Sequence, residues 1–498
     1  MKIKENMNNM KKYILLLAIL GGGLFTSCSD WLDLRPHSAL DDETAITSVK
    51  DAQIALLAAY DGLRSYGTFG RNIFIVGDAG CADVVLRTDN SNRYVNQYRW
   101  NLRPGDGPGA EIWRGLYADV INNVNEIIGR FTDIEVLPSE EAAKSQVLGE
   151  CHFLRALAYY ELAKLFGQPY SAGGLGVPYL KVSTMDNEHA RESLTSNFEN
   201  IIEDLGKALS MMNIAKRTSV TTVGSDAVNA LLARVYLYMG DYAKAAQYAE
   251  AVITSGRYTL ATPTEYTTTL SADKKVFTSG GLWGNKEHKE SIFALPYITT
   301  ERLYTNSLAN IYTDKTKGYG DLVASEELVG LFTAGDVRKS MVYAYNEGTE
   351  GAPNHWCVGK FIGGGASGEF DLSFINIFRI SEMYLIAAEA NARTGNQTKA
   401  LERINNLREQ RGLDAISSIG NALINDILLE RRLELCFEGH SYADAKRLGK
   451  SIVRSADAMN PENPTMGLAY PDYRFAYPIP ESERNVNSLL EQNSGYSQ

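Results

Sequence analysis

Apolar residues recur at three- and four-residue spacing along much of the chain, which is the pattern of helices that bury one face. In one such segment the repeating positions are Trp113, Leu116, Val120, Val124 and Ile127. The pattern predicts helices over residues 51–64, over residues 111–130, and from about residue 139 to just before Gly167. These helices indicate a mostly α protein.

Two further segments have the pattern of paired antiparallel helices. Residues 225–258 carry two apolar, alanine-rich stripes on either side of a turn at Gly240. Residues 379–412 repeat this plan around Gly395. Such pairs resemble tetratricopeptide (TPR) hairpins, which stack into scaffolds that bind other molecules. The predicted fold class is therefore mostly α, with a TPR-like helical-hairpin scaffold.

The helical pattern is lost between the two hairpins. Residues 257–374 are rich in Gly, Thr, Ser and Tyr, and within them only residues 325–332 predict a short helix. Residues 66–108 form a second loop-rich region. Long irregular segments on a rigid scaffold commonly carry binding residues, so we expect a ligand surface there. We predict a single domain over residues 28–498: a scaffold of residues 36–256 and 375–498, and an inserted irregular lobe of residues 257–374 with few short strands.

The first residues have a different pattern, typical of a secretory signal. Lys11 and Lys12 precede an apolar run over residues 13–25, which is shorter than the roughly 20 residues that span a membrane. Phe25, Thr26 and Ser27 then precede Cys28. This order resembles a bacterial lipobox, in which the cysteine is acylated and becomes the new N-terminus. We predict a lipoprotein signal peptide over residues 1–27, with Met10 as an alternative start, and lipid attachment at Cys28. A packed thiol is the alternative, but residues 26–33 are too polar to bury one.

Charge and cysteine content narrow the class of partner. The chain has a formal net charge of −11 at pH 7, and the predicted signal peptide carries more lysines than acidic residues, so the mature chain is more acidic still. An acidic chain binds phosphate groups poorly, which argues against a nucleic-acid partner. The four remaining cysteines are widely spaced and indicate no disulfide pattern, although an exported chain could form disulfides. They are Cys81, Cys151, Cys357 and Cys436.

A search for catalytic and metal-binding motifs identifies no candidate. No histidines have zinc-site spacing, and the glycine-rich residues 361–370 lack the features of a phosphate loop or a nucleophile elbow. Glu430, Glu434 and Glu438 recur at four-residue spacing beside two arginines, which predicts ion pairs along one helical face. A glycosidase needs two carboxylates that face each other across a cleft. We therefore predict no catalytic residue, no metal site and no cofactor, with an exported glycan hydrolase as the less favoured alternative.

Several stretches resemble, in the same order, segments of the SusD/RagB-like outer-membrane nutrient-binding lipoproteins. They are "WRGLYADVINNVNEII", "GECHFLRALAYYELAKLFGQPY", "RISEMYLIAAEA", "INNLREQRGL", "ILLERRLELCFEGHSYADAKRLG" and "YPIPESERNVN". The resemblance implies a non-catalytic lipoprotein, anchored in the outer membrane and facing the cell exterior. It also implies that the protein binds oligosaccharides or polysaccharide and delivers them to a partner TonB-dependent transporter of the SusC type. Some members of the family bind peptides instead.

With the resemblance, the aromatic and polar residues of the two loop regions become candidates for sugar contact. Sugar rings stack on Tyr and Trp, and their hydroxyls pair with Asn and Arg. Trp100 and Trp113 belong to apolar stripes or border them, and we expect them to be structural. Two alternatives to glycan binding stay open besides the hydrolase: a RagB-like peptide-binding lipoprotein, and a TPR-type lipoprotein that assembles other envelope proteins. The candidate ligand-binding residues are Tyr66, Arg87, Asn90, Asn92, Tyr94, Trp283, Tyr297, Tyr304 and Tyr312.

Overall fold

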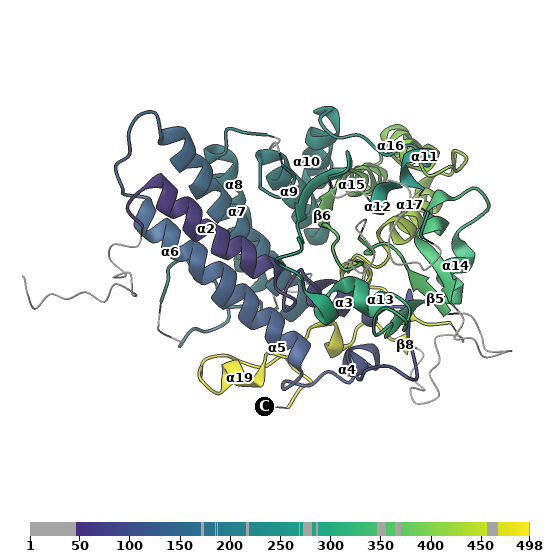
Figure 1. Cartoon of the computed structure of the whole chain (residues 1–498), viewed down its shortest axis with the longest axis horizontal. Coiled ribbons are helices and arrows are strands. Elements are labelled where there is room, and N and C mark those ends of the chain that lie inside the picture. Colours follow the sequence, from purple (N-terminus) through teal and green to yellow (C-terminus); the bar gives the residue numbers. More distant parts are fainter. Residues whose placement is uncertain are drawn as a thin grey trace, which may run out of the picture. The chain divides into compact units, whose positions relative to one another are not determined.

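The predicted helices of the N-terminal half are present, with one difference in their regularity (Figure 1). In the computed structural model these predicted helices are α2 (Val49–Arg64), α5 (Gly107–Arg114), the π-helix η3 (Gly115–Ile121), α6 (Asn122–Phe131) and α7 (Glu141–Phe166), and α8 (Leu194–Met211) follows them. The segment predicted as one helix over residues 111–130 is thus α5, η3 and α6 in succession. At this π-helical turn the backbone lies very close to α2. A Cβ atom added at Gly62 of α2 would lie only 2.6 Å from the Asp119 carbonyl oxygen.

The structure describes residues 46–170, 174–184, 186, 188–215, 219–267, 269–271, 281–284, 287–345, 355–363, 370–455 and 467–497. Within the chain, Ser48–Gln498 forms one unit by its internal contacts.

Both predicted hairpins are present and pack on each other. They are α9 (Ser225–Met239) with α10 (Tyr242–Thr254), and α15 (Ile380–Arg393) with α16 (Gln397–Glu409). Gly240 and Gly395 adopt left-handed φ values of 80° and 84° at the two turns, which favours glycine there. Asp241 and Asn396 then cap the second helix of each pair through their side chains. The packing of α10 against α15 joins the two hairpins into one scaffold. α15 also contacts α17 (Gly420–Leu435).

The loop-rich regions contain short elements rather than long ones. Their helices are α3 (Asn72–Ala79), α4 (Val95–Tyr98), α11 (Pro263–Tyr266), α12 (Gly281–Gly284), η5 (Tyr304–Asn306), α13 (Leu308–Tyr312), α14 (Glu326–Leu331) and η6 (Val337–Met341). The short helix predicted over residues 325–332 is α14. The last part of the chain adds α18 (Ser441–Arg447), η8 (Tyr473–Phe475) and α19 (Glu481–Arg484).

Short antiparallel strands connect these regions. One sheet has the order β1-β3-β5-β4, and two further pairs join β2 to β6 and β7 to β8. Through β1 and β3, the first loop region pairs with the second, with Val85 opposite Val323. The strands are β1 (Val84–Leu86), β2 (Ser291–Leu295), β3 (Leu322–Ala324), β4 (Val342–Tyr345), β5 (His355–Val358), β6 (Ile375–Arg379), β7 (Ile452–Val453) and β8 (Gly467–Leu468).

A buried ion-pair network links the irregular segments to the helical scaffold. At its centre, Glu434 of α17 lies 2.9 Å from both Arg379 and Arg411, and all three side chains are buried. Although burial opposes ionisation, these arginines and Arg338 hold the pKa of Glu434 well below its usual value. The members of the buried ion-pair network are Glu290, Asp336, Arg338, Lys360, Arg379, Arg408, Arg411, Glu430, Glu434 and Glu438.

The sequence prediction for these glutamates is confirmed in its chemistry and wrong in one point of geometry. Glu430 and Glu434 pair with arginines as predicted. Glu438 is not on the same helix, because α17 ends at Leu435 and the chain turns at Phe437, whose φ is 67°. Its carboxylate nevertheless reaches Arg379 at 2.7 Å and Lys360 at 2.5 Å.

Asp78 of α3 is a buried carboxylate whose contacts predict a pH-dependent stability. It accepts hydrogen bonds from the Tyr312 hydroxyl (2.8 Å) and the Gly439 backbone N–H (3.0 Å). Burial raises the pKa of Asp78 to about 8; its two donors oppose that shift. Since the unfolded carboxyl titrates near pH 4, the folded state alone holds the proton between about pH 4 and pH 8. The contribution of Asp78 to stability is therefore complete below pH 4 and is lost as the pH rises towards 8.

We expect Asp78→Asn to remove this pH dependence. Between pH 5 and pH 8, the free energy of unfolding of the wild type should fall relative to that of the variant by roughly 1 kcal/mol per pH unit. Denaturant unfolding of both proteins at pH 5, 6, 7 and 8 measures the difference. A difference that does not change with pH would show that Asp78 is ionised throughout.

Candidate ligand-binding groove

A polar groove opens beside the first loop region, between the end of α2, the starts of α3 and α5, and α4. Its volume is about 490 Å³, within the range of small-ligand sites. We call it the Tyr66 groove. Its lining residues are Tyr66, Arg71, Asn92, Arg93, Tyr94, Val95, Asn96, Gln97, Asp106, Gly107, Pro108, Glu111 and Asn306. In Figure 1 the elements that carry it, α3, α4 and α5, lie in the lower half of the view.

Two tyrosines and an arginine form the aromatic part of the groove. Tyr66 is 36% exposed, so part of its ring is open to a ligand. The Arg71 guanidinium lies 4.8 Å from the ring centre of Tyr66 and 5.7 Å from that of Tyr94. The Tyr94 hydroxyl donates to Asn72 Oδ1 at 2.6 Å, which fixes the ring. The groove thus presents an aromatic surface that the protein holds in place before a ligand binds.

The rest of the wall consists mainly of amides and carboxylates. Asp106 accepts from the Asn96 amide at 2.7 Å and from the Arg103 backbone N–H at 2.8 Å. Glu111 accepts from the Asn72 amide at 2.6 Å. Such groups match the hydroxyls of a polar ligand, while the aromatic surface matches its apolar face.

Left-handed backbone conformations gather around the groove. Asn92 and Tyr94 line it with φ values of 64° and 58°, and Tyr304, in the same short helix as the lining residue Asn306, has a φ of 47°. These conformations are costly for residues other than glycine, and they cluster at binding sites in proteins. Their presence here supports the interpretation of the groove as a binding site.

The structure brings some of the predicted residues together here. Tyr66, Asn92 and Tyr94 line the groove. Tyr304 is 60% exposed, and the Arg302 guanidinium lies 4.8 Å from its ring centre. Asn90 does not line the groove; it accepts from the Asn92 backbone N–H at 2.7 Å and so shapes the turn that presents Asn92.

Other predicted residues lie in the interior, so for them the interpretation as ligand contacts is corrected. Tyr312 is fully buried and donates to Asp78, and Tyr297 is buried and donates to the Arg64 carbonyl at 2.6 Å. Trp283 is buried with Lys360 and Arg379 over its ring. Arg87 is buried and pairs with Asp89 at 3.0 Å. The physical reason is that their rings and charges already contact protein groups, which leaves no open face for a ligand.

Sequence reasoning missed several residues of the groove. Arg71, Arg93 and Asn96 lie within or beside the predicted loop region 66–108, but nothing in their spacing distinguished them. Asn306 comes from the other loop region and accepts from Arg71 Nη1 at 2.8 Å. A systematic look at arginines next to the predicted tyrosines, as in Arg93–Tyr94, would have found one of them. As predicted, Trp100 and Trp113 are buried and structural.

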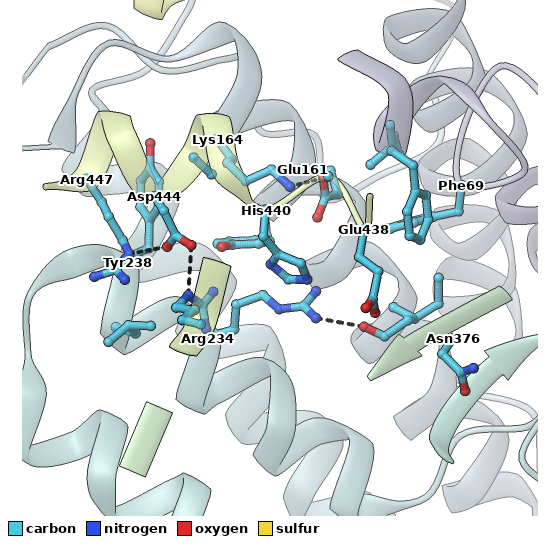
Figure 2. Close-up of a pocket in the computed structure, with 18 residues that line it drawn as sticks. Phe69, Glu161, Lys164, Arg234, Tyr238, Asn376, Glu438, His440, Asp444 and Arg447 are labelled. Carbon is cyan, nitrogen blue, oxygen red and sulfur yellow. Dashed lines mark hydrogen bonds and ion pairs between the residues drawn. The ribbon is translucent and has the colours of Figure 1, made fainter. Parts of the chain in front are cut away.

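A second, enclosed pocket is rich in charge but pairs its charges internally (Figure 2). Asp444 lies 2.7 Å from both Arg431 and Arg447, and Lys164 pairs with Glu161. Burial lowers the pKa of His440 well below its usual value, so this ring is neutral at pH 7. The Asp444–Arg431 pair joins α18 to α17, and we assign these groups to the fold.

A third hollow, which we call the Tyr117 groove, lies between η3 and residues 178–189 and 483–490. Its polar groups are engaged with the backbone: the Tyr117 hydroxyl donates to the Pro178 carbonyl at 2.6 Å, and the Asn125 amide donates to the Leu180 and Val182 carbonyls. Unlike the Tyr66 groove, its lining among the described residues contains no arginine.

Comparison with known proteins identifies the family. A model described as "SusD family" matches residues 340–496, and a model described as "Starch-binding associating with outer membrane" matches residues 30–237. The chain is 27% identical to SusD-like protein P2 of Formosa agariphila, across 98% of this chain and 100% of that protein. It is 24% identical to a SusD-like protein of Bacteroides ovatus, across 87% and 82%.

Solved structures agree with this result. A putative sugar binding protein from Bacteroides vulgatus is 26% identical, with a TM-score of 0.80 over 91% of this chain and 100% of that one. A SusD superfamily protein from Bacteroides thetaiotaomicron is 28% identical, with a TM-score of 0.79 over 90% and 99%. The chain belongs to the SusD/RagB-like family and has its mostly α, TPR-like fold.

Two further findings concern the membrane and the cysteines. Among the described residues, no helix is long and apolar enough to cross a membrane. Cys28 lies outside the described residues. Cys81, Cys151, Cys357 and Cys436 are buried free thiols.

Proposed function

We propose that the protein binds oligosaccharides or polysaccharide in the Tyr66 groove and has no catalytic role. The observation that carries the proposal is the combination, in one groove, of a partly exposed tyrosine with amides and arginines. An aromatic face and converging hydrogen-bonding groups are what a sugar ring requires. The family model described as starch-binding and the relative described as a putative sugar binding protein support the same class of ligand.

The second part of the proposal concerns location and partner. We propose that residues 1–27 are a signal peptide, that Cys28 carries the lipid, and that the protein faces the cell exterior from the outer membrane. There it delivers its ligand to a TonB-dependent transporter of the SusC type. The description "associating with outer membrane" of the matching family model supports this location.

Substitution of Tyr66 tests the glycan proposal. Screening the mature protein against a polysaccharide panel by affinity electrophoresis should identify a ligand, and Tyr66→Ala should then weaken that binding about tenfold, because the stacking face is lost. Calorimetry with the matching oligosaccharide measures the change. Tyr473→Ala, which also removes a partly exposed tyrosine but lies outside the groove, is the matched control and should bind as the wild type.

Three outcomes would contradict the proposal. Binding of peptides but of no glycan would assign the protein to the RagB-like, peptide-binding alternative. New reducing ends on incubation with a glycan would show an enzyme. Equal affinities of the wild type and Tyr66→Ala for a glycan would place the site elsewhere.

A further inference from the structure

The Tyr66 groove contains two arginines that pair with no carboxylate among the described residues. Arg71 donates to Asn72 Oδ1 at 3.1 Å and to Asn306 Oδ1 at 2.8 Å, and its cation otherwise faces tyrosine rings. Arg93 donates to the Thr305 carbonyl at 2.9 Å and lies 4.2 Å from the ring centre of Tyr319. Both guanidinium groups are thus held in place by neutral partners.

Three arginines just outside the groove have carboxylate partners. Arg64 pairs with Asp61 at 2.6 Å and also with Glu301. Arg87 pairs with Asp89, and Arg302 pairs with Asp371. The groove thus holds two guanidinium groups without a carboxylate partner in the described part of the chain, whereas each of these three neighbouring arginines has one.

The two acidic side chains of the groove, Asp106 and Glu111, do not serve as carboxylate partners of Arg71 or Arg93. Glu111 is separated from Arg71 by the Asn72 side chain, which donates its amide to Glu111 and accepts from Arg71 Nε. Asp106 is engaged by Asn96 and by the Arg103 backbone. Both carboxylates are therefore engaged by N–H donors from uncharged groups and lie away from the two guanidinium groups.

Burial makes the lack of a counter-charge costly. Arg71 is only 6% exposed, and a buried cation without a charged partner destabilises a protein unless something compensates for it. A guanidinium pairs with carboxylate or sulfate oxygens through charge-assisted, often bidentate hydrogen bonds. An anionic group of a ligand, placed between Arg71 and Arg93 while its ring lies on Tyr66, would supply the missing charge.

We propose that the Tyr66 groove selects acidic glycans, in which a carboxylate or a sulfate ester on the sugar pairs with Arg71 and Arg93. This inference rests on the proposed glycan-binding function and adds the class of sugar.

The test compares acidic and neutral forms of the same sugar chains. Affinity electrophoresis of the mature protein should show retardation by one or more of polygalacturonate, alginate and sulfated galactan, and weaker or no retardation by their neutral counterparts, methyl-esterified pectin, mannan and unsulfated galactan. Raising sodium chloride from 50 to 500 mM should weaken the binding to the acidic chain. Preference for the uronates identifies carboxylate as the anionic group, and preference for the sulfated chain identifies sulfate.

Arg93→Gln is the decisive variant. The Arg93 side chain is only half-buried, so the substitution should leave the fold intact. The variant should lose about tenfold in affinity for the acidic chain and much less for the neutral counterpart, so that the preference for the acidic chain falls. Arg71→Gln should act in the same direction, and Arg103→Gln, an exposed arginine of the same loop region that does not line the groove, should bind as the wild type. Equal binding of acidic and neutral chains, or an unchanged preference in Arg93→Gln, would overturn the inference while leaving glycan binding intact. Failure to bind any glycan would instead overturn the proposed function.

Discussion

Replacing Glu434 with alanine is expected to lower the free energy of unfolding by about 3–5 kcal/mol. Glu434 is fully buried and shared by Arg379 and Arg411, each at 2.9 Å, with Arg338 at 3.6 Å. Removing this carboxylate leaves three buried guanidinium groups with one counter-charge fewer, and none of them can reach water without movement of the fold. A loss of this size is a large fraction of the stability of a typical protein.

A surface glutamate provides the matched control for this variant. Glu203 also has two cationic partners, Lys181 at 2.8 Å and Lys207 at 2.7 Å, but all three side chains are largely exposed. Glu203→Ala should therefore change the free energy of unfolding by less than about 1 kcal/mol. Urea unfolding followed by circular dichroism compares the two variants. Equal, small losses in both would show that the buried ion-pair network does not hold the fold together.

The expected consequence extends to the groove, because the network fastens the irregular lobe to the scaffold. Glu290, Arg338 and Lys360 come from the lobe, whereas Arg411 and Glu434 come from the helical part. A destabilised network should loosen the lobe, which supplies Asn306 to the groove. Glu434→Ala should for this reason weaken ligand binding, even though Glu434 does not line the groove.

The second large effect is expected at the predicted lipid attachment site. Cys28→Ala should move the protein from the membrane fraction to the soluble fraction, because a lipid chain cannot be attached to alanine and the net negative charge of the chain opposes electrostatic binding to an anionic membrane surface. Fractionation of cells that produce each protein, followed by immunoblotting, measures the distribution. A Cys28→Ala protein that stays in the membrane fraction through its own lipid would contradict the lipobox interpretation.

A paired substitution separates anchorage from orientation. Asp30 and Asp33 follow Cys28, and acidic residues at this place resemble a signal for export to the cell surface. Replacing both with alanine should leave the protein in the membrane fraction but protect it from protease added to intact cells. Continued digestion by external protease would show that the two aspartates do not direct surface exposure.

Helices with a regular apolar repeat were predictable from the sequence, and the residues that line the candidate groove were only partly so. Periodicity located α2, α7 and both hairpins, because burial of one helical face dictates the repeat. It could not show that the tyrosines at 297 and 312 are buried, because their segments lack a repeat and their hydroxyls find partners far away in sequence, at Arg64 and Asp78. Contacts of this kind depend on the tertiary fold.

The same limit explains the residues that were missed. Arg71 and Asn306 meet at 2.8 Å although they are 235 positions apart, and no local pattern predicts that pairing. Tyr66, Asn92 and Tyr94 were found because aromatic and amide residues in a loop region are the usual components of a sugar site. The composition of a loop thus indicated the chemistry of the groove, and only the fold showed which side chains share it.

Hydrogen–deuterium exchange of the mature protein, with and without a bound oligosaccharide from the panel, tests the central claim most directly. If the ligand occupies the Tyr66 groove, amide exchange should slow in residues 66–72, 92–97 and 304–306 and stay unchanged in residues 178–184 and 486–490, which border the Tyr117 groove. Slower exchange in residues 178–184 and 486–490, with none in residues 66–72 and 92–97, would contradict the assignment of the binding site.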